Sequence, residues 1–450
     1  MTGFEKNGNS MAWPVLPKPN GSTRSTMRHR SRPDTPRRGR RILWIVGAGL
    51  LVIVVAASGF VVYQYNSLAG SIHRSTVVMP TAIPTPGVPQ DTGASNILIM
   101  GLDSRLDENG KPLPAEIYGA LHAGNGSDGG YNTNVLMLIH IPGNGAPAVG
   151  ISIPRDDYTD LPGSPDGESK SKIKEAYGLE LDQTFNHLVN TTKLTRSDIY
   201  QQARTAARQE EITTVSQFLG GVAIDHFVEV TMAAFYQVAE AVQPVTVCLN
   251  ETTSDPYSGA NFQAGNQQLS AAQAVSFVRQ RRDTKNAALD FTDLDRARRQ
   301  QAFIISLAYK LKQEGTFTNF ETLGSLVTVA KQNIAIDSGL NLLSFAHDAQ
   351  SFAGGNITFV TLPIAGFATV GGKDVNLVDL VQVRAEVAQL LAPLTANPTP
   401  VSTPHSTAKP TEGSTPAPTH SAVVPSATTA PDVSKEWATP VKSGSIPCVK

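Results

Sequence analysis

The sequence predicts an α/β (α+β) fold in which helices sandwich a mixed central β-sheet, formed by one domain at residues 94–392. Two observations support this prediction. Strand-like and helix-like segments alternate along the domain, which is typical of layered α/β and α+β architectures. The strand-like segments at residues 96–101, 135–141 and 148–153 are also continuous apolar runs, as expected of central strands covered on both faces.

The other elements of the domain follow from helical spacing, capping residues and glycine stops. Ser270 is a candidate N-cap, Ser197 and Asp198 are plausible caps, and Gly220 and Gly221 form a plausible helix stop. Residues 107–130 indicate a loop with a short helix. We expect helices at residues 168–188, 197–219, 232–242, 270–278, 296–313, 320–332, 340–354 and 378–391, and further strands at 222–230, 244–249 and 357–362.

The segments before this domain indicate a membrane anchor. Residues 1–41 are polar and basic, which predicts a disordered cytoplasmic segment. Residues 42–65 form a predicted transmembrane helix, because residues 42–63 are apolar and uncharged and about 20 such residues span a bilayer. The preceding arginines place the N-terminus in the cytoplasm. A cleaved signal peptide is the alternative, but the basic leader and the apolar run are both too long for one.

This topology predicts a single-pass protein of the cell membrane whose folded domain is extracytoplasmic. Residues 66–93 form a spacer rich in Pro and Thr, and residues 393–450 form a tail rich in Pro, Thr and Ser that cannot bury a core. Outside the cell a disulfide is permitted, so Cys248 and Cys448 are a candidate pair. Two unpaired thiols remain the alternative, since sequence alone does not place the sulfur atoms.

Charge excludes nucleic acid as a partner. The formal net charge is −1, and basic residues are in excess only before the apolar span. The rest of the chain is acidic on balance, whereas nucleic-acid binding needs a broad basic face. The sequence also lacks the motifs GxxxxGK[ST], HExxH, CxxC and GxSxG, which excludes the commonest phosphate loops, zinc sites and serine hydrolase sites.

Arginines gather in two stretches that predict a site for a diphosphate. Arg155 follows the apolar run at residues 148–153, and strand ends are where α/β sheets bind ligands. Arg279 and Arg281 are two residues apart, so an extended segment places both on one face. Guanidinium groups bind phosphate oxygens bidentately. A second group, Arg296, Arg299 and Gln300, shares one face of the helix predicted at 296–313.

Ordinary ion pairs are the alternative for the second stretch, since Asp290, Asp293 and Asp295 lie beside these arginines. The pairing with the first stretch favours a site instead. Asp103 and Arg105 leave the strand at residues 96–101 in the same way as Arg155 leaves its strand. Asp103 is therefore a candidate ligand for Mg²⁺, which bridges phosphates through one or two carboxylates. A turn or capping role is the alternative for Asp103.

Several motifs together resemble the LytR-CpsA-Psr family of membrane-anchored glycopolymer transferases. They are NILIMGLDSR at residues 96–105, SIPRD at 152–156, KIKEAYG at 172–178, and the segments 265–281 and 293–301. The resemblance is to the actinobacterial, mycobacterial CpsA-type members. It implies a polyprenyl diphosphate held in an apolar pocket by arginines and Mg²⁺ (or Mn²⁺). Phe227, Phe235, Phe303 and Leu307 are candidates for lining that pocket, or for simple core.

The resemblance also implies roles for individual residues. The implied catalytic residues are Arg155, Arg279, Arg281 and Asp293, and the implied metal ligands are Asp103 and Asn134. Contacts to the diphosphate are implied for Arg105, Arg155, Lys172, Arg279, Arg281, Arg296, Arg299 and Gln300. Two positions depart from the family pattern: many members have Asp where this chain has Asn134, and a familiar Gly is replaced by Asp295.

The activity implied is transfer of a cell-wall glycopolymer, of the arabinogalactan type, from a polyprenyl diphosphate to peptidoglycan through a phosphodiester. One alternative is a pyrophosphatase that hydrolyses polyprenyl or nucleotide diphosphates. Another is a non-catalytic adaptor or sensor that binds the lipid diphosphate. A transcription attenuator fits badly, because the basic segment before the apolar span has no helix-turn-helix pattern.

Overall fold

The computed structural model describes residues 72–81, 93–124, 130–316, 333–341, 354–392 and 438–450, together with Leu326, Lys331, Ser344, Phe345 and Asp348. The predicted segments at residues 1–41 and 42–65 lie outside this part. So does almost all of the helices expected at 320–332 and 340–354. Among the described residues, no helix has the length and the apolar character that crossing a membrane requires.

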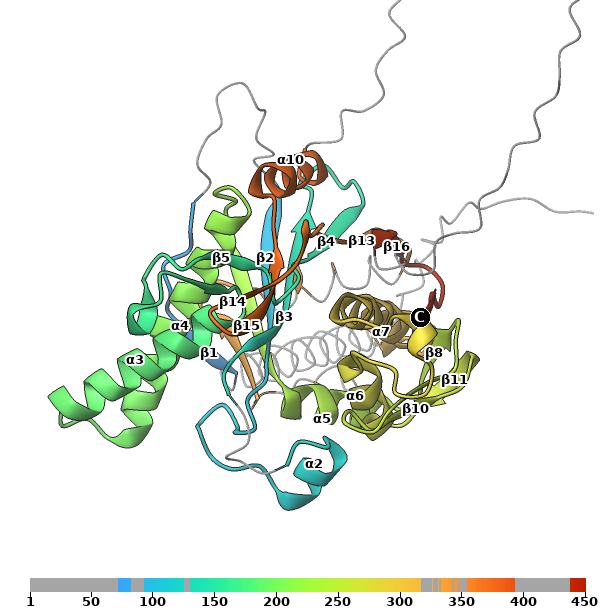
Figure 1. The fold of residues 1–450 in the computed structure, drawn as a ribbon, viewed down its shortest axis with the longest axis horizontal. Coiled ribbons are helices and arrows are strands. Elements are labelled where there is room, and N and C mark those ends of the chain that lie inside the picture. Colours follow the sequence, from blue (N-terminus) through green and yellow to red (C-terminus); the bar gives the residue numbers. More distant parts are fainter. Residues whose placement is uncertain are drawn as a thin grey trace, which may run out of the picture. The chain divides into compact units, whose positions relative to one another are not determined.

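A mixed eight-stranded sheet forms the centre of the described domain (Figure 1). The three apolar runs predicted as central strands are neighbours in it, as β2, β3 and β4, and they pair antiparallel. Leu98 and Leu138, which face each other across β2 and β3, are fully buried. The strand order is β1 (His73–Ser75), β12 (Ile334–Asp337), β7 (His226–Thr231), β2 (Ser95–Leu102), β3 (Thr133–Ile141), β4 (Ala148–Ser152), β13 (Ile357–Thr361) and β16 (Val441–Lys442).

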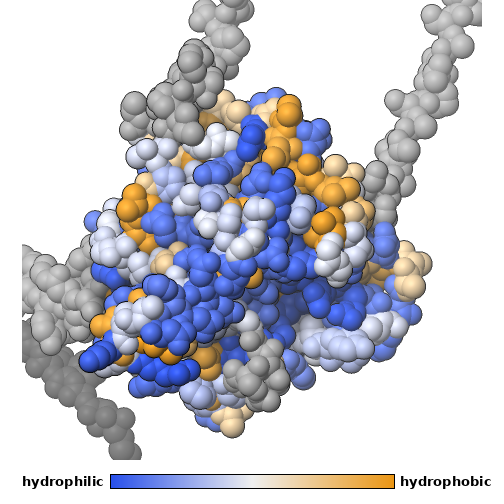
Figure 2. Space-filling view, turned by 60° about the vertical axis from the view of Figure 1, so that its left-hand side comes forward, coloured by the Kyte–Doolittle hydropathy of each residue, from blue (hydrophilic) through white to orange (hydrophobic). Residues whose placement is uncertain are grey.

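Helices cover both faces of the sheet, which confirms the predicted sandwich. On one face, α4 (Arg196–Phe218) and α10 (Leu380–Leu390) bury apolar side chains against β2, β3 and β4. On the other face, Ile305 of α7 (Asp293–Gln313) packs with Ile97 and Met137. The helix α3 (Glu175–Thr191) lies along α4, and α2 (Ala115–Ala120) is the short helix expected in the loop. On the surface seen in Figure 2, hydrophilic residues predominate and apolar ones form small groups.

A second apolar core lies under a smaller sheet of β11 (Gly265–Leu269), β8 (Val245–Leu249) and β17 (Cys448–Val449). The helices α5 (Met232–Val242), α6 (Ala271–Arg279) and α7 pack against it. Cys248 and Cys448 face each other in adjacent strands and form a disulfide with an S–S distance of 1.92 Å. Residues 441–450 therefore belong to the folded domain. The tail expected at residues 393–450 was predicted not to bury a core, but Val441 and Val449 at its end are core residues.

Local sequence signals placed most elements well. Ser270 caps α6 through a capping box with Gln273, as its position in the sequence predicted. The helix expected from residue 168 begins only at Glu175, because residues 170–172 form strand β6 (Lys170–Lys172) against β5 (Tyr158–Asp160). Two hairpins had no prediction: β9 (Thr253–Asp255) with β10 (Ala260–Phe262), and β14 (Gly366–Val370) with β15 (Lys373–Leu377).

Four buried charged side chains join α4 to the sheet and to the loop after β2. Arg204 and Arg208 of α4 both bind Glu229 of β7 and Glu108 of the loop. Burial raises the pKa of Glu229, but the two guanidinium groups outweigh it and hold that pKa at about 2. Glu108 anchors the loop that carries Asp103 and Arg105, so this network fixes residues of the candidate site.

We predict that Glu229→Gln lowers the free energy of unfolding by about 3–5 kcal/mol, because it leaves buried guanidinium charge without its partner. The measurement is urea unfolding of the full chain followed by circular dichroism. Glu314→Gln removes one carboxylate from an exposed pair with Lys310 and should change stability little. Equal stability of the two variants would contradict the prediction.

Candidate functional site: an arginine-lined cavity beside the central sheet

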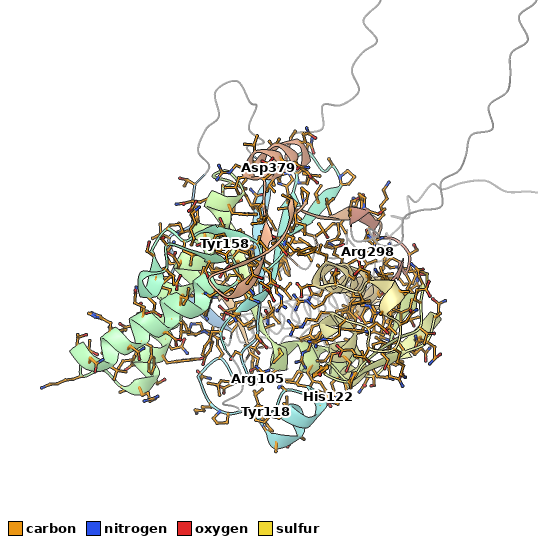
Figure 3. The ribbon with its side chains drawn as sticks, in the orientation of Figure 1. Arg105, Tyr118, His122, Tyr158, Arg298 and Asp379 are labelled. Carbon is orange, nitrogen blue, oxygen red and sulfur yellow. A yellow bond between two sulfur atoms is a disulfide. The ribbon has the colours of Figure 1, made fainter. Side chains whose placement is uncertain are left out.

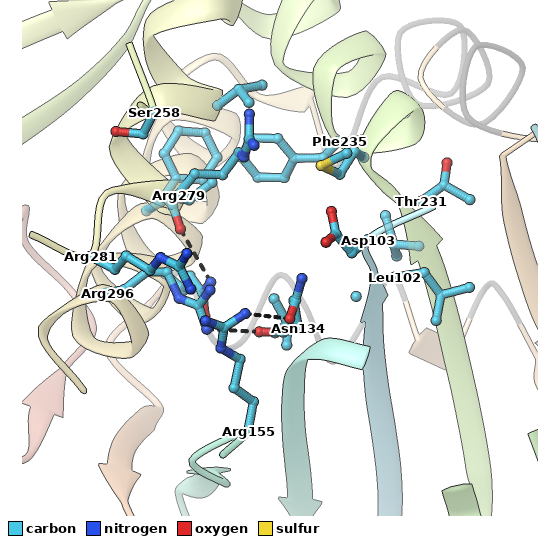
Figure 4. A pocket seen from close by; sticks show the side chains of 18 of the residues that line it. Leu102, Asp103, Asn134, Arg155, Thr231, Phe235, Ser258, Arg279, Arg281 and Arg296 are labelled. Carbon is cyan, nitrogen blue, oxygen red and sulfur yellow. Dashed lines mark hydrogen bonds between the residues drawn. The ribbon is translucent and has the colours of Figure 1, made fainter. Parts of the chain in front are cut away.

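A cavity of about 440 Å³ lies where β2, β3 and β7 meet the helices α5, α6 and α7 (Figure 4). The strands contribute residues from one edge of the sheet: the end of β2, the start of β3 and the end of β7. The cavity is lined by Ile99, Gly101, Leu102, Asp103, Arg105, Asn134, Val135, Arg155, Val230, Thr231, Met232, Phe235, Asp255, Tyr257, Ser258, Val275, Val278, Arg279, Arg281, Arg282, Arg296, Gln300, Phe303, Ile304 and Leu307.

Arginines from separate segments gather in the lining of the cavity. Arg279 is the last residue of α6, and Gln280 leaves the helix with φ −59° and ψ 129°. This change to an extended backbone lets Arg279 and Arg281 line the same cavity, as their spacing predicted. Arg296 comes from α7 and Arg155 from the segment after β4. The two predicted arginine stretches thus meet in space.

Arg155 connects the sheet to α7. It is buried, and its Nη1 donates to Oδ1 of Asn134 on β3. Its Nε donates to Asp293 Oδ2 at 3.1 Å, and its Nη2 lies 3.0 Å from Asp293 Oδ1, so both carboxylate oxygens contact the guanidinium and Oδ2 accepts the hydrogen bond. Arg296 Nη2 donates to the same Asp293 at 3.1 Å and to the Asn134 carbonyl at 3.2 Å.

Burial and mutual repulsion disfavour the charged form of two arginines in this wall. The pKa of Arg296 is lowered to about 10, first by burial and then by the charge of Arg155. Burial also lowers the pKa of Arg279, and the neighbouring Arg105 and Arg281 lower it further. Groups whose charged form is disfavoured in this way gain stability when an anion binds, because the anion offsets their repulsion.

Lys172 lies beside this site without lining the cavity. Its Nζ is 3.5 Å from Asp156 Oδ1, and Nζ of Lys174 is 2.6 Å from the same atom. Burial raises the pKa of Asp156, but Arg155 and Lys174 outweigh it, so the carboxyl is held ionised. Asp156 Oδ2 also lies 3.5 Å from Nε of Arg155. Lys172 is therefore connected to the cavity-lining Arg155 through the Asp156 carboxylate.

Arg299, predicted to bind the diphosphate, lies outside the cavity. It is fully buried and donates to the main-chain oxygen of Lys450 at 2.7 Å, to Gln280 Oε1 at 2.7 Å and to Thr253 Oγ1 at 2.9 Å. Gln300, for which a diphosphate contact was also predicted, lines the cavity. Successive helical residues are about 100° apart, so Arg299 and Gln300 flank Arg296 on opposite sides and only one of them faces the cavity.

Asp103 and Asn134, the two predicted metal ligands, lie at the adjoining ends of β2 and β3. Asp103 lines the cavity, with Oδ1 3.5 Å from Arg105 Nη1. The amide oxygen of Asn134 is already engaged by Arg155. Among the residues that the structure describes, no group of three or more His, Cys, Asp or Glu side chains is arranged to hold a metal ion.

Another part of the cavity lining is apolar. The rings of Phe235 and Phe303 have centroids 5.1 Å apart, and Met232, Ile304 and Leu307 extend the wall. Ile304 is partly exposed although it is apolar. Phe235, Phe303 and Leu307 were candidates for this role, whereas Phe227 is a fully buried core residue. A cavity with one arginine wall and one apolar wall suits an amphiphile with an anionic head.

Sequence reasoning missed the residues that hold the Asp103–Arg105 loop. Glu108 binds the α4 arginines, and Tyr118 of α2 donates through its hydroxyl to the Arg105 carbonyl at 2.8 Å. Figure 3 shows Arg105 and Tyr118 close together. The sequence offered one signal: Arg204, Arg208 and Glu211 share one face of the helix predicted at residues 197–219. The structure shows that all three side chains are buried.

We predict that Arg299→Met lowers stability without a specific effect on anion binding. The substitution leaves three buried acceptors without their donor, and each such loss costs about 1–3 kcal/mol. Urea unfolding of the full chain measures stability, and inorganic pyrophosphate binding at a temperature where the variant is folded measures the site. Loss of pyrophosphate affinity by a folded variant would contradict this assignment.

The LytR_cpsA_psr family model matches residues 60–390. The chain is 37% identical over 295 residues to the cell wall biosynthesis protein LcpA of Corynebacterium glutamicum, which covers 65% of this chain and 55% of that protein. It is 24% identical over 293 residues to the polyisoprenyl-teichoic acid–peptidoglycan teichoic acid transferase TagU of Bacillus mycoides, covering 65% of this chain and 77% of that one.

Among solved structures, a LytR-Csp2A-Psr enzyme from Actinomyces oris is similar, with 20% identity, a TM-score of 0.45, and coverage of 71% of this chain and 97% of that one. The matched part of this chain spans about half the length of the Corynebacterium relative. The family model itself covers well over half of the present sequence. The chain therefore belongs to the LytR-CpsA-Psr family.

Proposed function

We propose that this protein is a phosphotransferase that ligates a polyprenyl-diphosphate-linked cell-wall glycopolymer, of the arabinogalactan type, to peptidoglycan. The observation that carries the proposal is the pairing of an arginine wall with an apolar wall in one cavity. The arginines suit the diphosphate, and the apolar wall suits the start of the polyprenyl chain. A membrane anchor at residues 42–65, with the domain outside the cytoplasm, would bring the cavity to its lipid.

The relatives support the same reading. The TagU protein of Bacillus mycoides is named as a transferase that moves teichoic acid from a polyisoprenyl carrier to peptidoglycan. The LcpA protein of Corynebacterium glutamicum is named as a cell wall biosynthesis protein. The choice of arabinogalactan rests on the likeness to this actinobacterial relative and is part of the proposal.

In the proposed reaction, a hydroxyl of peptidoglycan attacks the phosphorus atom that carries the glycan. The bond from this phosphorus to the bridging oxygen breaks, and polyprenyl phosphate leaves with the bonding electrons while the hydroxyl proton passes to water. Arg155, Arg279, Arg281 and Arg296 would hold the two phosphoryl groups and neutralise the charge that develops on them. Asp293 would keep Arg155 and Arg296 correctly oriented through the bonds described above.

We also propose that Mg²⁺ (or Mn²⁺) assists at Asp103. Mg²⁺ is usually held by one or two carboxylates together with substrate phosphates and water, and Asp103 supplies one carboxylate in the cavity. Asn134 would contribute at most its amide oxygen, which it shares with Arg155. A bound Mg²⁺ would supply further neutralisation of the diphosphate. These residues therefore fit a metal that binds weakly before the substrate arrives.

We predict that Arg281→Ala reduces transfer of glycan from lipid to peptidoglycan by about 100-fold or more, because one donor to the transition-state charge is lost. The full chain in detergent is incubated with a polyprenyl-diphosphate-linked glycan and peptidoglycan fragments, and products are identified by mass spectrometry. A phosphodiester-linked adduct establishes the transferase.

Arg196→Ala is the matched control, since this arginine is exposed at the start of α4 and is not among the residues that line the cavity. It should leave transfer unchanged. Unaltered transfer by Arg281→Ala would sink the site assignment. Release of free phosphorylated glycan by the wild type would indicate a pyrophosphatase, and tight lipid binding without turnover would indicate an adaptor or sensor.

We further predict that Asn134→Asp increases the apparent affinity for Mg²⁺ in the transfer assay, because a second carboxylate is added beside Asp103. Transfer rates are measured against Mg²⁺ concentration for the wild type and the variant, and calorimetry with Mg²⁺ alone gives a readout independent of activity. Identical Mg²⁺ dependence in both measurements would show that residue 134 does not contribute to the metal site.

A further inference from the structure

The turn between β9 and β10 is rigid although it reaches the cavity. Asp255 is 1% exposed. Its Oδ1 accepts from the backbone N–H of Tyr257 at 3.1 Å, and its Oδ2 accepts from the Ser258 hydroxyl at 2.9 Å. A carboxylate that bonds the backbone two residues on forms an Asx turn, which fixes the local conformation. Asp255, Tyr257 and Ser258 all line the cavity.

The same turn packs against residues 121–123, whose backbone carbonyls accept hydrogen bonds from Arg279 and Arg105. Gly259 has φ +77°, and a Cβ atom there would lie 2.5 Å from Nε2 of His122, so the turn and His122 are in close contact. His122 follows α2, where Figure 3 labels it. Its neighbours bind the site: Arg279 donates to the Leu121 carbonyl, and Arg105 Nε donates to the Ala123 carbonyl at 2.5 Å. The turn is therefore fixed relative to the arginine wall.

Tyr257 is an aromatic side chain held in place yet left open. It is 70% exposed, and the guanidinium of Arg282 lies 4.5 Å from its ring centroid. The Arg282 segment is itself tied to β9, because Ser254 N–H donates to Asp283 Oδ2 at 2.7 Å. Arg282 therefore stacks on the ring from a fixed segment. With Tyr257 70% exposed, most of this residue is left open at the rim of the cavity.

A lipid-linked glycan has two substituents on its diphosphate, and they need different surroundings. The apolar wall with Phe235 and Phe303 suits the polyprenyl chain, so the sugar must leave the arginines along another surface. Among the described cavity-lining residues, Tyr257 is the aromatic one outside the apolar wall. Sugar rings carry apolar C–H faces that pack on an aromatic ring and hydroxyls that bond to polar neighbours. Arg282 supplies such a neighbour beside the ring.

We propose that the β9–β10 turn is a carbohydrate subsite, in which the exposed ring of Tyr257 stacks on the first sugar ring attached to the diphosphate. This inference rests on the proposed function and adds the element that distinguishes a glycan-bearing lipid from the bare lipid diphosphate. Tyr257 is a binding residue for the sugar, and Asp255 is a positioning residue that holds the turn.

The test compares two probes on the full chain in detergent: undecaprenyl diphosphate, and the same lipid carrying one N-acetylglucosamine. We expect the wild type to bind the sugar-bearing lipid more tightly. Tyr257→Ala should weaken that binding about tenfold, the size of a lost aromatic contact, and change binding of the bare lipid less than twofold. Tyr257→Phe keeps the ring and should stay near wild type for both lipids.

Val381→Ala is the matched control, because Val381 is an exposed side chain of α10 outside the cavity lining. Circular dichroism verifies that each variant is folded. Equal weakening of both lipids by Tyr257→Ala, or no weakening of either, would overturn the subsite while leaving the proposed function standing. Failure of the wild type to bind either lipid would overturn the proposed function and the subsite with it.

Discussion

The site depends on the ion pair between Arg155 and Asp293, in which both carboxylate oxygens contact the guanidinium. Arg155 follows β4 and Asp293 begins α7, so this pair and the bond from Arg155 to Asn134 lock the first turn of α7 onto the edge of the sheet. Asp293 also binds Arg296. A charge-assisted pair of this kind has a defined geometry. The position of Arg296 in the cavity is therefore set by the same interaction that orients Arg155.

Stability and function make opposite demands on this arrangement. Burying like charges together is costly, and the lowered pKa of Arg296 reflects that cost. The buried network of Arg204, Arg208, Glu108 and Glu229 lies under the same edge of the sheet, but there each guanidinium meets two carboxylates. One cluster is therefore internally neutralised and structural, whereas the other retains positive charge that an anion can offset.

The fold and part of the site could be predicted because both depend on local signals. Continuous apolar runs identified β2, β3 and β4, and the alternate spacing of Arg279 and Arg281 identified two lining residues. Arg299 could not be placed, since helical spacing gives an arc of the helix and not the side of it that faces a cavity. The β9–β10 turn was missed because its residues acquire a role only through Asp255, His122 and Arg282, which tertiary packing brings together.

The departure at Asn134 fits the charge distribution of the cavity. A carboxylate at this position would face Arg155 at hydrogen-bond distance and compete with Asp293 for the same guanidinium. The amide accepts the hydrogen bond without adding negative charge, so Arg155 keeps its pair with Asp293 and the wall remains more positive. Under the proposed function, this would move the neutralisation of the diphosphate charge from a divalent cation toward the arginines. Guanidinium groups fixed in advance need no reorganisation when phosphates bind, so the proposed phosphoryl transfer would be compatible with a weaker metal site.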